Sequence, residues 1–427
     1  MGTEGSTAEQ PATALGTVLG IDDLPVRLRA WDGSVAGPPG APVVTVRDRR
    51  ALRRLVWSPG QVGLGRAYVV GELDVEDDVV ATLAALTTAG WSATAERAQA
   101  PTVRQRAGLL GTAARLGALG PPLPRPPQEV RPRRSGRRHT RTRDAAAIAH
   151  HYDVGNDFYR LVLGPTLVYS CAVWNSPGTG LDAAQEAKLD LVCRKLALRP
   201  GTRLLDVGCG WGSLALHAAQ QYGADVVGVT ISTAQAALAR ERVAAAGLAD
   251  RVEIRVQDYR DVPDGPFDAI SSIGMAEHVG AAGMPAYVAT LRDLLRPGGR
   301  LLNHAIAQNA GDPRSRRGTF INRFVFPDGE LLRLGDTVVA LEAGGLEVLD
   351  VEALRRHYAL TLRAWLERLD KHWDAAVAAS DEGRARVWRL YMAVSALAFE
   401  TGRLGVNQVL ARRPGGEDPP LRLRAWL

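Results

Sequence analysis

Apolar runs and helical segments alternate along residues 203–305. Short apolar runs that predict buried strands lie near 203–207, 225–230, 252–256, 267–273 and 300–305. Segments with the apolar spacing of helices lie near 213–222, 233–246 and 284–295, and Pro297-Gly298-Gly299 predicts a turn into the last strand. Because such alternation is typical of a parallel sheet covered on both faces, the pattern predicts a doubly wound α/β domain.

The chain outside this alternation divides into regions of different character. We predict a disordered tail at 1–22, a small α+β domain at 23–95, a linker at 96–143 and a catalytic domain at 144–427. In the small domain, strands are expected at 26–31 and 43–47, helices at 48–57 and 76–89, and a turn-rich stretch at 63–75. In the catalytic domain, helices are expected up to about 198, at 361–378 and at 382–402, with a polar insert at 309–342.

The linker combines prolines with positive charge. Prolines at 121, 122, 124, 126, 127 and 132 exclude a helix there, and arginines at 131, 133, 134, 137, 138, 141 and 143 make its end strongly basic. Two interpretations stay open, a solvated spacer or a segment that binds anions.

Net charge, cysteine spacing and the length of apolar runs indicate which partners and which cellular compartment to expect. The net charge of +6 and the pI of about 9.5 favour an anionic partner, either nucleic acid or an anionic membrane surface. The spacing of Cys171, Cys193 and Cys209 fits neither a zinc site nor a disulfide framework, which favours a reducing compartment. No run approaches the roughly 18 uninterrupted apolar residues of a membrane span, so we expect membrane contact to be peripheral.

A glycine loop follows the first predicted strand of the alternating region. Its sequence, Leu205-Asp206-Val207-Gly208-Cys209-Gly210-Trp211-Gly212-Ser213, has the spacing G-x-G-x-G. Dinucleotide-binding loops have G-x-G-x-x-G instead. Glycines at this position let the backbone approach a ligand closely. The loop suits a ligand with an amino-acid head and no pyrophosphate, such as S-adenosylmethionine; a glycine turn without a ligand is the alternative.

Polar residues follow the other predicted strands of the sheet. Thr230, Ser232 and Gln235 follow the second strand, Gln257, Asp258 and Tyr259 the third, and Ile273, Gly274, Glu277 and His278 the fourth. Ligands of such sheets bind beyond the carboxyl ends of the strands, so these residues are candidate ligand contacts. An acid and an amide after the third strand suit the amine of adenine. The alternatives are that Asp258 caps a helix and that Gln235 is solvated.

Nine stretches of the sequence carry a resemblance to a known family. They are HHYDVGNDFY, VYSCAVW, LLDVGCGWGSLALHAA, VVGVTIS, QDYRDV, SIGMAEHVG, LRPGGRLLNHAIA, INRFVFPDGEL and HYALTLRAWLERL. In this order they resemble the S-adenosylmethionine-dependent cyclopropane fatty acid synthases, which include the mycolic acid cyclopropane synthases, over about residues 144–410. The resemblance implies a Rossmann-like methyltransferase domain with a helical insert.

The resemblance also implies a reaction. Family enzymes add the methyl group of S-adenosylmethionine to a cis double bond in an acyl chain of a membrane phospholipid, and a bound bicarbonate ion deprotonates the resulting carbocation. By resemblance, the bicarbonate cradle here consists of Cys171, Glu277, His304, Ile306 and Tyr358. In the rival interpretation Cys171 is a covalent nucleophile, but the sulfonium of the cofactor would alkylate a thiolate.

The resemblance assigns the cofactor contacts as well. They are Tyr169, Ser170, Asp206, Gly208, Gly210, Thr230, Gln235, Gln257, Asp258 and Ile273, and no metal is expected. Three phenylalanines of the insert, Phe320, Phe324 and Phe326, are either walls of a lipid channel or ordinary core aromatics.

Two products follow from one carbocation. Loss of a proton from the added methyl group closes a cyclopropane, whereas a hydride shift before that loss gives a methylene branch, which a separate downstream reductase would convert to a methyl branch. The long N-terminal region and the segment 399–409 resemble the actinobacterial subgroup that makes 10-methylene chains. Ala146 stands where we expect a polar or acidic residue in that subgroup, so this chain could be an impaired variant.

The resemblance and the composition also lead to expectations about binding partners and location in the cell. We expect an unsaturated phospholipid as substrate, an anionic membrane surface and no nucleic acid as partners, and a cytoplasmic enzyme associated peripherally with the inner face of the cell membrane. Homo-oligomer formation stays open. The rival functions are a methyltransferase for RNA or a small molecule, and a non-catalytic lipid-binding protein.

Overall fold

The computed structural model describes residues 8–19, 21, 23–89, 103–130, 155–309, 319–327, 329–421 and 424. The chain forms two compact units. The first comprises Met1–Arg133, Arg317–Pro327 and Ala376–Leu397, and the second comprises Arg134–Arg316, Asp328–Ala375 and Ala398–Leu427. The first unit therefore includes two segments from the region that the sequence assigned to the catalytic domain.

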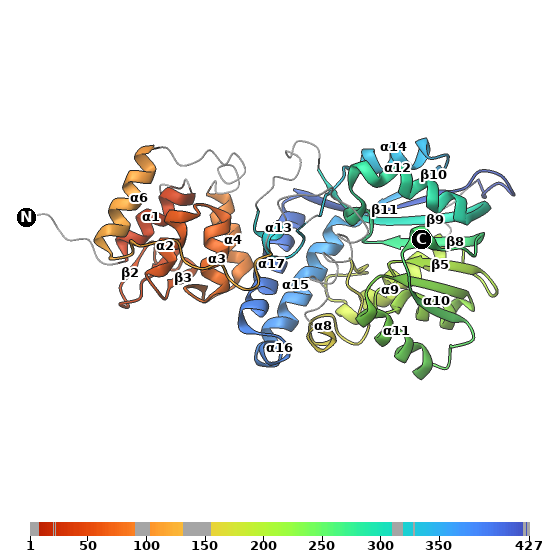
Figure 1. Ribbon diagram of the computed structural model, residues 1–427, viewed down its shortest axis with the longest axis horizontal. Helices are drawn as coiled ribbons and strands as arrows, with labels where there is room; N and C mark the ends of the chain where they lie inside the picture. The colour runs from red at the N-terminus through yellow and green to blue at the C-terminus, as the bar shows by residue number, and fades with distance from the viewer. Residues whose placement is uncertain are drawn as a thin grey trace, which may run out of the picture. The chain divides into compact units, whose positions relative to one another are not determined.

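A seven-stranded sheet forms the centre of the second unit (Figure 1). Its order is β10-β11-β9-β8-β5-β6-β7. The strands are β5 (Arg203–Val207), β6 (Asp225–Thr230), β7 (Val252–Val256), β8 (Phe267–Ile273), β9 (Leu295–Gln308), β10 (Glu347–Ala353) and β11 (Leu404–Arg412). The five strands from β7 to β9 pair in parallel, as the alternation predicted. The antiparallel strands β11 and β10, which the sequence analysis missed, extend the sheet beyond β9.

Helices cover both faces of this sheet. They are α8 (Asn156–Leu163), α9 (Leu181–Lys195), α10 (Ser213–Tyr222), α11 (Thr233–Ala245), α12 (Ala276–Leu294), α14 (Leu334–Ala343) and α15 (Arg355–Lys371), with the short 3-10 helix η1 (Tyr259–Asp261). Figure 1 shows α9, α10 and α11 on one side of the sheet and α12 and α14 on the other. Neighbouring residues of β5 point to opposite faces of the sheet. Leu204 packs in the core that includes residues of α9 and α10, and Leu205 packs in the core that includes residues of α12 and α14.

Local signals define most of these helices. Ser232 caps α11 by accepting a hydrogen bond from the backbone N–H of Gln235, and α10 ends at Gly223 in the left-handed conformation. The helix predicted near 284–295 begins earlier, at Ala276, and Gly280, with φ of 68°, interrupts its helical backbone. The predicted Pro-Gly-Gly turn lies inside the range of β9, where Gly298 has φ of 76°.

The first unit contains a four-stranded sheet of order β2-β1-β3-β4. Its strands are β1 (Arg27–Arg29), β2 (Val35–Ala36), β3 (Val43–Val46) and β4 (Leu73–Val75), and its helices are α1 (Glu9–Leu19), α2 (Arg50–Trp57), α3 (Gln61–Val69), α4 (Val79–Thr88), α6 (Val103–Arg115) and α13 (Phe320–Phe324). Helix α16 (Trp373–Ala379) and helix α17 (Glu382–Glu400) each contribute residues to both units.

Three predictions for this region were wrong. The tail predicted at 1–22 contains helix α1, in which Ala14 and Leu15 are buried, and the predicted linker contains helix α6. The stretch predicted as turn-rich at 63–75 begins with helix α3. Its glycines suggested a turn, but Gly65 allows close packing, since an added Cβ would meet Phe320 Cδ2 at 2.4 Å.

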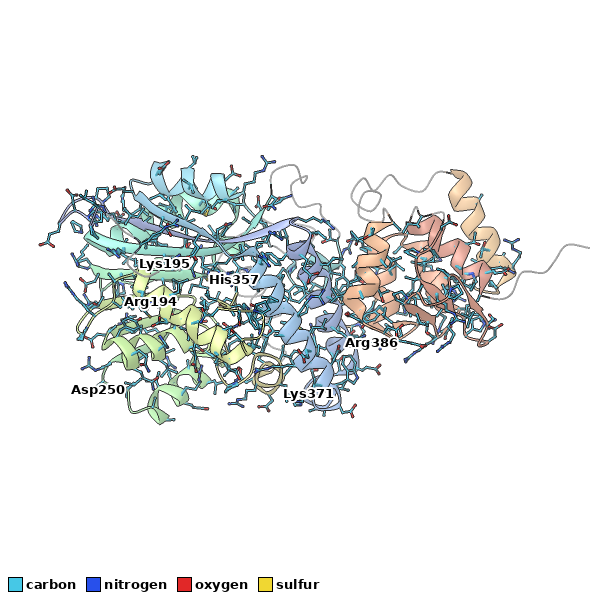
Figure 2. All side chains as sticks on the ribbon, turned by 180° about the vertical axis from the view of Figure 1, so that it is seen from behind. Arg194, Lys195, Asp250, His357, Lys371 and Arg386 are labelled. Atoms are coloured by element: carbon cyan, nitrogen blue, oxygen red, sulfur yellow. The ribbon has the colours of Figure 1, made fainter. Side chains whose placement is uncertain are left out.

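Buried ion pairs hold the later segments of the chain in the first unit. The carboxylate of Glu129 accepts two hydrogen bonds from Arg66, at 2.6 and 2.7 Å, and a third from Arg323 at 3.2 Å. Arg386, labelled in Figure 2, donates to the carbonyl of Tyr68 at 2.7 Å and pairs with Asp74 at 3.0 Å. Bidentate guanidinium contacts fix orientation as well as distance. Within the described ranges, no helix is long and apolar enough to cross a membrane.

Candidate active site

The order of strands places a topological switch point at the carboxyl end of β5. In the order of strands, β6 and β7 follow β5 in one direction, whereas β8 and β9 lie next to β5 in the opposite direction. Ligands of doubly wound sheets bind at such a switch point. The predicted contacts Gly208, Thr230, Gln257 and Ile273 follow or end the strands β5, β6, β7 and β8, so they lie along this edge.

The three glycines of the loop share a backbone conformation but differ in the space around them. All lie in the left-handed region, with φ of 76° at Gly208, 55° at Gly210 and 77° at Gly212. An added Cβ at Gly208 would meet Met275 Sδ at 2.5 Å, and one at Gly212 would meet Ala239 Cβ at 3.2 Å. Among the described residues other than its two chain neighbours, no heavy atom lies within 4 Å of the corresponding position at Gly210. The backbone is therefore open at Gly210, and the loop fits a ligand such as S-adenosylmethionine there.

Asp206 lies below the loop inside the sheet. It is buried, and its Oδ1 accepts a hydrogen bond from Ser271 Oγ at 2.7 Å. Burial raises the pKa of Asp206 to about 6, against the opposing effects of Ser271 and the positive charge of Lys188. Lys188 is itself buried, which lowers its pKa to about 8. Lys188 was not predicted from the sequence, because nothing in the sequence of a helix marks one of its lysines as buried.

The end of β6 is tied to the start of α11. Thr230 Oγ1 donates to Gln235 Oε1 at 3.0 Å, and the backbone N–H of Ser232 donates to Thr230 Oγ1 at 3.2 Å. Gln235 is only 5% exposed, so the alternative that it is solvated is wrong. The bonds fix the Thr230 and Gln235 side chains at the predicted edge.

The residues after β7 already have protein partners. Asp258 caps η1, and its Oδ1 accepts from the backbone N–H and Nε of Arg260 at 3.0 and 2.8 Å. Gln257 Nε2 donates to the carbonyl of Asp261 at 2.7 Å. The alternative that Asp258 caps a helix is confirmed for this 3-10 turn. Ile273 ends β8 and lies directly opposite His304 of β9.

Aromatic rings surround the segment that contains Tyr169 and Ser170. The ring of Tyr169 lies 5.8 Å from that of Tyr159 and 5.3 Å from that of Trp365, and Tyr159 lies 4.7 Å from Trp211 of the glycine loop. Buried Gln185 donates to the carbonyl of Ser170 at 3.2 Å. The cluster connects the predicted cofactor contacts to helix α15. Tyr159 and Trp365 stand inside stretches quoted for the resemblance, but the sequence analysis gave them no role.

Glu277 and Ile306 form one corner of the predicted cradle. Glu277 Oε1 accepts a hydrogen bond from the backbone N–H of Ile306 at 2.8 Å. Glu277 Oε2 is buried and has no hydrogen-bond partner among the described residues. Burial raises the pKa of Glu277 to about 7. The carboxyl group therefore holds its proton to a higher pH than an exposed glutamate, and its second oxygen has no partner among the described residues.

His304 of β9 carries a second buried atom that has no partner among the described residues. It is 2% exposed, and its Nδ1 lies 3.2 Å from Gln408 Nε2, whereas its Nε2 has no partner in the described part of the chain. Burial, with the charges of Lys188 and Lys195, lowers the pKa of His304 to about 3, so the ring is neutral. Lys195, labelled in Figure 2, is itself buried and pairs with Glu352.

Cys171 and Tyr358 meet at the carbonyl of Leu354. The Cys171 thiol contacts this oxygen at 3.7 Å, and the backbone N–H of Tyr358 donates to it at 3.1 Å. Burial raises the pKa of the Cys171 thiol well above its usual range. Because the thiolate is the nucleophilic form, a protonated thiol here argues against the rival role of Cys171 as a covalent nucleophile.

A chain of contacts joins the five predicted cradle residues. Leu354 donates its backbone N–H to the carbonyl of Val406 at 2.8 Å, and Val406 pairs with Ile306 across β11 and β9. His304 precedes Ile306 by two residues, so the two side chains lie on the same face of β9. These contacts connect segments that are up to 187 positions apart, from Cys171 to Tyr358.

Other predicted residues lie elsewhere. Phe320 and Phe324 are buried in the first unit with their rings 4.8 Å apart, which favours the alternative of ordinary core aromatics, and Phe326 packs on Tyr391. Ala146 and the arginines at 131–143 lie outside the described residues.

The chain is similar to known proteins over most of its length. The family model described as mycolic acid cyclopropane synthetase matches residues 139–409. A probable fatty acid methyltransferase of Mycobacterium tuberculosis is 44% identical over 415 residues, which are 94% of each chain. The tuberculostearic acid methyltransferase UfaA1 of the same organism is 36% identical over 92% of this chain and 88% of its own length.

A solved structure also superposes on the catalytic part. The mycolic acid cyclopropane synthase CmaA1, complexed with S-adenosylhomocysteine and CTAB, is 34% identical, with a TM-score of 0.60 over 63% of this chain and 98% of that chain. The fold, the open glycine loop and these matches agree: the chain belongs to the mycolic acid cyclopropane synthetase family and is a methyltransferase that uses S-adenosylmethionine.

Proposed function

We propose that this enzyme methylates the cis double bond of an unsaturated acyl chain in a membrane phospholipid. One observation carries the proposal: the open loop at Gly210 accompanies a buried group of residues in which His304 Nε2 and Glu277 Oε2 have no hydrogen-bond partner within the described part of the chain. A methyltransferase acting on nitrogen or oxygen has no need of such a cradle. Two relatives, a probable fatty acid methyltransferase and a cyclopropane-fatty-acyl-phospholipid synthase, support a lipid substrate by their names.

The aromatic cluster suits the first step. When bound, S-adenosylmethionine supplies an electrophilic methyl group. An alkene is a weak nucleophile, and its methylation leaves a carbocation on the neighbouring carbon. Tyr159, Tyr169, Trp211 and Trp365 exclude water that would otherwise quench this cation. Aromatic faces also attract positive charge.

The cradle suits the second step, removal of a proton. When bound, bicarbonate supplies the base. We propose that His304 donates from Nε2 to this anion and that the thiol of Cys171 and the phenol of Tyr358 help to hold it. Glu277, whose pKa is raised to about 7, takes up the proton or orients the anion through its second oxygen. We also propose that Tyr169, Ser170, Asp206, Gly208, Gly210, Thr230, Gln235, Gln257, Asp258 and Ile273 form the cofactor site, with Asp206 acting from beneath the loop.

We propose a methylene branch as the product. Both products lose a proton from the added methyl group, and they differ only in whether a hydride shifts first. The fatty acid methyltransferases match over 92–94% of this chain, including its N-terminal region, whereas the Escherichia coli cyclopropane-fatty-acyl-phospholipid synthase matches over 62%. Cyclopropane formation is the second candidate, because the family model and the superposed structure carry that name. A separate reductase would act on the methylene product.

Ala146 provides a test of product choice. A carboxylate there could stabilise the migrating cation, since a dry site strengthens such interactions. We expect Ala146→Glu to raise the yield of methylene lipid while cofactor affinity is unchanged. Proton NMR of extracted lipids separates exocyclic methylene from ring protons. Equal yields from both forms, or a purely cyclopropane product, would contradict this role.

We further propose that the enzyme docks on anionic lipid at the inner face of the cell membrane. The arginines at 131–143 would contribute roughly 1 kcal/mol each near such a surface, and salt would weaken the binding. Replacing them with glutamine should reduce sedimentation with anionic vesicles. If the variant sediments with the vesicles as well as the wild-type protein does, the segment at 131–143 is only a spacer.

One experiment tests the substrate class. The enzyme is incubated with S-adenosylmethionine carrying a labelled methyl group and with separate pools of unsaturated phospholipid and RNA. Label in the phospholipid acyl chains supports the proposal. Label in RNA would identify an RNA methyltransferase, and no label in either pool would favour a small-molecule substrate or a non-catalytic lipid-binding protein.

A further inference from the structure

Gln408 lies beside the predicted cradle and has no role in the function proposed above. It is fully buried on β11, directly opposite His304 in the antiparallel pair of β11 and β9. Residues that are directly opposite in such a pair project from the same face of the sheet. The pairing therefore presents the amide of Gln408 to the imidazole of His304.

With the amide of Gln408 oriented as in the structure, the contact between them assigns the proton of His304 to one ring nitrogen. Gln408 Nε2 lies 3.2 Å from His304 Nδ1, and an amide nitrogen can only donate. The imidazole nitrogen that accepts must be unprotonated. Because burial keeps the ring neutral, its single proton is on Nε2.

The proton on Nε2 points to a ligand. His304 is 2% exposed, and Nε2 finds no partner within the described residues. A buried N–H without a partner costs free energy, so its retention indicates a group that accepts from it. Glu277 Oε2 is likewise unpaired, and its other oxygen is held by Ile306, two residues after His304.

We propose that Gln408 is a positioning residue that fixes His304 in the tautomer whose Nε2–H donates to the anion of the cradle. Gln408 acts through His304 and does not itself contact substrate. The identity of the anion as bicarbonate rests on the function proposed above, whereas the tautomer does not.

The wild-type enzyme gives the first test. Nitrogen-15 NMR of histidine-labelled enzyme distinguishes protonated from unprotonated ring nitrogens, and a His304→Gln variant assigns the signals. We expect Nε2 to be protonated and Nδ1 to be bare. A proton on Nδ1 would overturn the inference, because it would mean that the amide is rotated and that Gln408 Oε1 accepts from the ring.

Two variants of similar volume give the second test. Gln408→Glu offers a carboxylate that only accepts, so it should move the proton to Nδ1, lower kcat about tenfold or more and leave KM for S-adenosylmethionine unchanged. Gln408→Met removes the bond without reversing it, so its loss of kcat should be smaller. If Gln408 only fills space, both variants lose stability while the His304 signals stay in place, and the inference falls.

Asn407→Asp is the matched control. It makes the same change from amide to carboxylate one residue away, on the opposite face of β11, and should leave the His304 signals unchanged. Titration with bicarbonate separates this inference from the proposed function. If the tautomer and kcat respond as expected but turnover ignores bicarbonate, Gln408 keeps its role and the anion is a different one. If turnover needs bicarbonate but Nδ1 carries the proton, the function stands and the role of Gln408 fails.

Discussion

The cofactor edge and the cradle are assembled in different ways. The edge uses consecutive elements, from β5 through η1, and residues 203–261 supply most of its predicted contacts. The cradle combines Cys171, Glu277, His304 and Tyr358, which meet through the pairing of β9 with β11 and the start of α15. A short motif can therefore encode the first region, whereas the second exists only after the sheet is complete.

The two regions also differ in how their polar groups are satisfied. At the edge, Asp206 is bonded to Ser271, and Thr230 to Gln235. In the cradle, His304 Nε2 and Glu277 Oε2 are buried without partners among the described residues. Buried polar atoms without partners destabilise a fold, and they are retained where function needs them. The polar groups named at the edge thus bond to one another, whereas the two unpartnered atoms of the predicted cradle are what the proposed anion site requires.

The largest expected effect separates binding from turnover. Glu277→Gln keeps an oxygen for the Ile306 N–H but removes a proton acceptor. We expect kcat to fall by about 10²–10⁴-fold while the affinity for S-adenosylmethionine, measured by calorimetry, stays near normal. Glu241→Gln, on the exposed surface of α11, is the control. A loss confined to cofactor affinity would contradict this prediction, because it would assign Glu277 to the cofactor edge and not to the cradle.

The same substitution should stabilise the protein in a pH-dependent way. The pKa of Glu277 is raised from 4.5 to about 7, so the folded state binds a proton that the unfolded state has lost. Ionisation of the buried carboxyl therefore destabilises the folded state. This destabilisation is absent below pH 4.5, grows between pH 4.5 and 7 and is constant above pH 7. Glu277→Gln should therefore raise the free energy of unfolding at pH 8 by up to about 3 kcal/mol. Thermal unfolding at pH 8 and pH 4.5 measures this, and an equal gain at both values would show that the carboxylate is not desolvated.

Gly210→Val should affect the cofactor edge alone. Valine is strained at a φ of 55°, and its side chain fills the space above the loop. We expect affinity for S-adenosylhomocysteine to fall about tenfold or more, which is about 1.4 kcal/mol. Gly201→Val is the matched control, because Gly201 also has positive φ and open space but lies before β5, at the opposite end of the strand. Equal affinity in a folded Gly210→Val protein would remove the loop from the cofactor site.

The sequence predicted what is encoded locally. The strands β5 to β8 and the glycine loop follow from periodicity and turn chemistry within about 70 residues. Strands β10 and β11 were missed, because their place depends on pairing with β9 and with each other. The cradle residues came from resemblance and not from spacing. Gln408 and Lys188 were missed for one reason: their importance arises from burial and register, which a single chain does not display.

Turnover as a function of bicarbonate tests the central claim most directly. Wild-type enzyme is supplied with S-adenosylmethionine and vesicles of cis-unsaturated phospholipid in buffer freed of carbon dioxide, and bicarbonate is then added back. The account predicts that methyl transfer to lipid is lost without bicarbonate and restored in a saturable manner, with cofactor affinity unchanged throughout. Turnover that is independent of bicarbonate would contradict it, because the unpaired atoms of His304 and Glu277 would then serve another purpose.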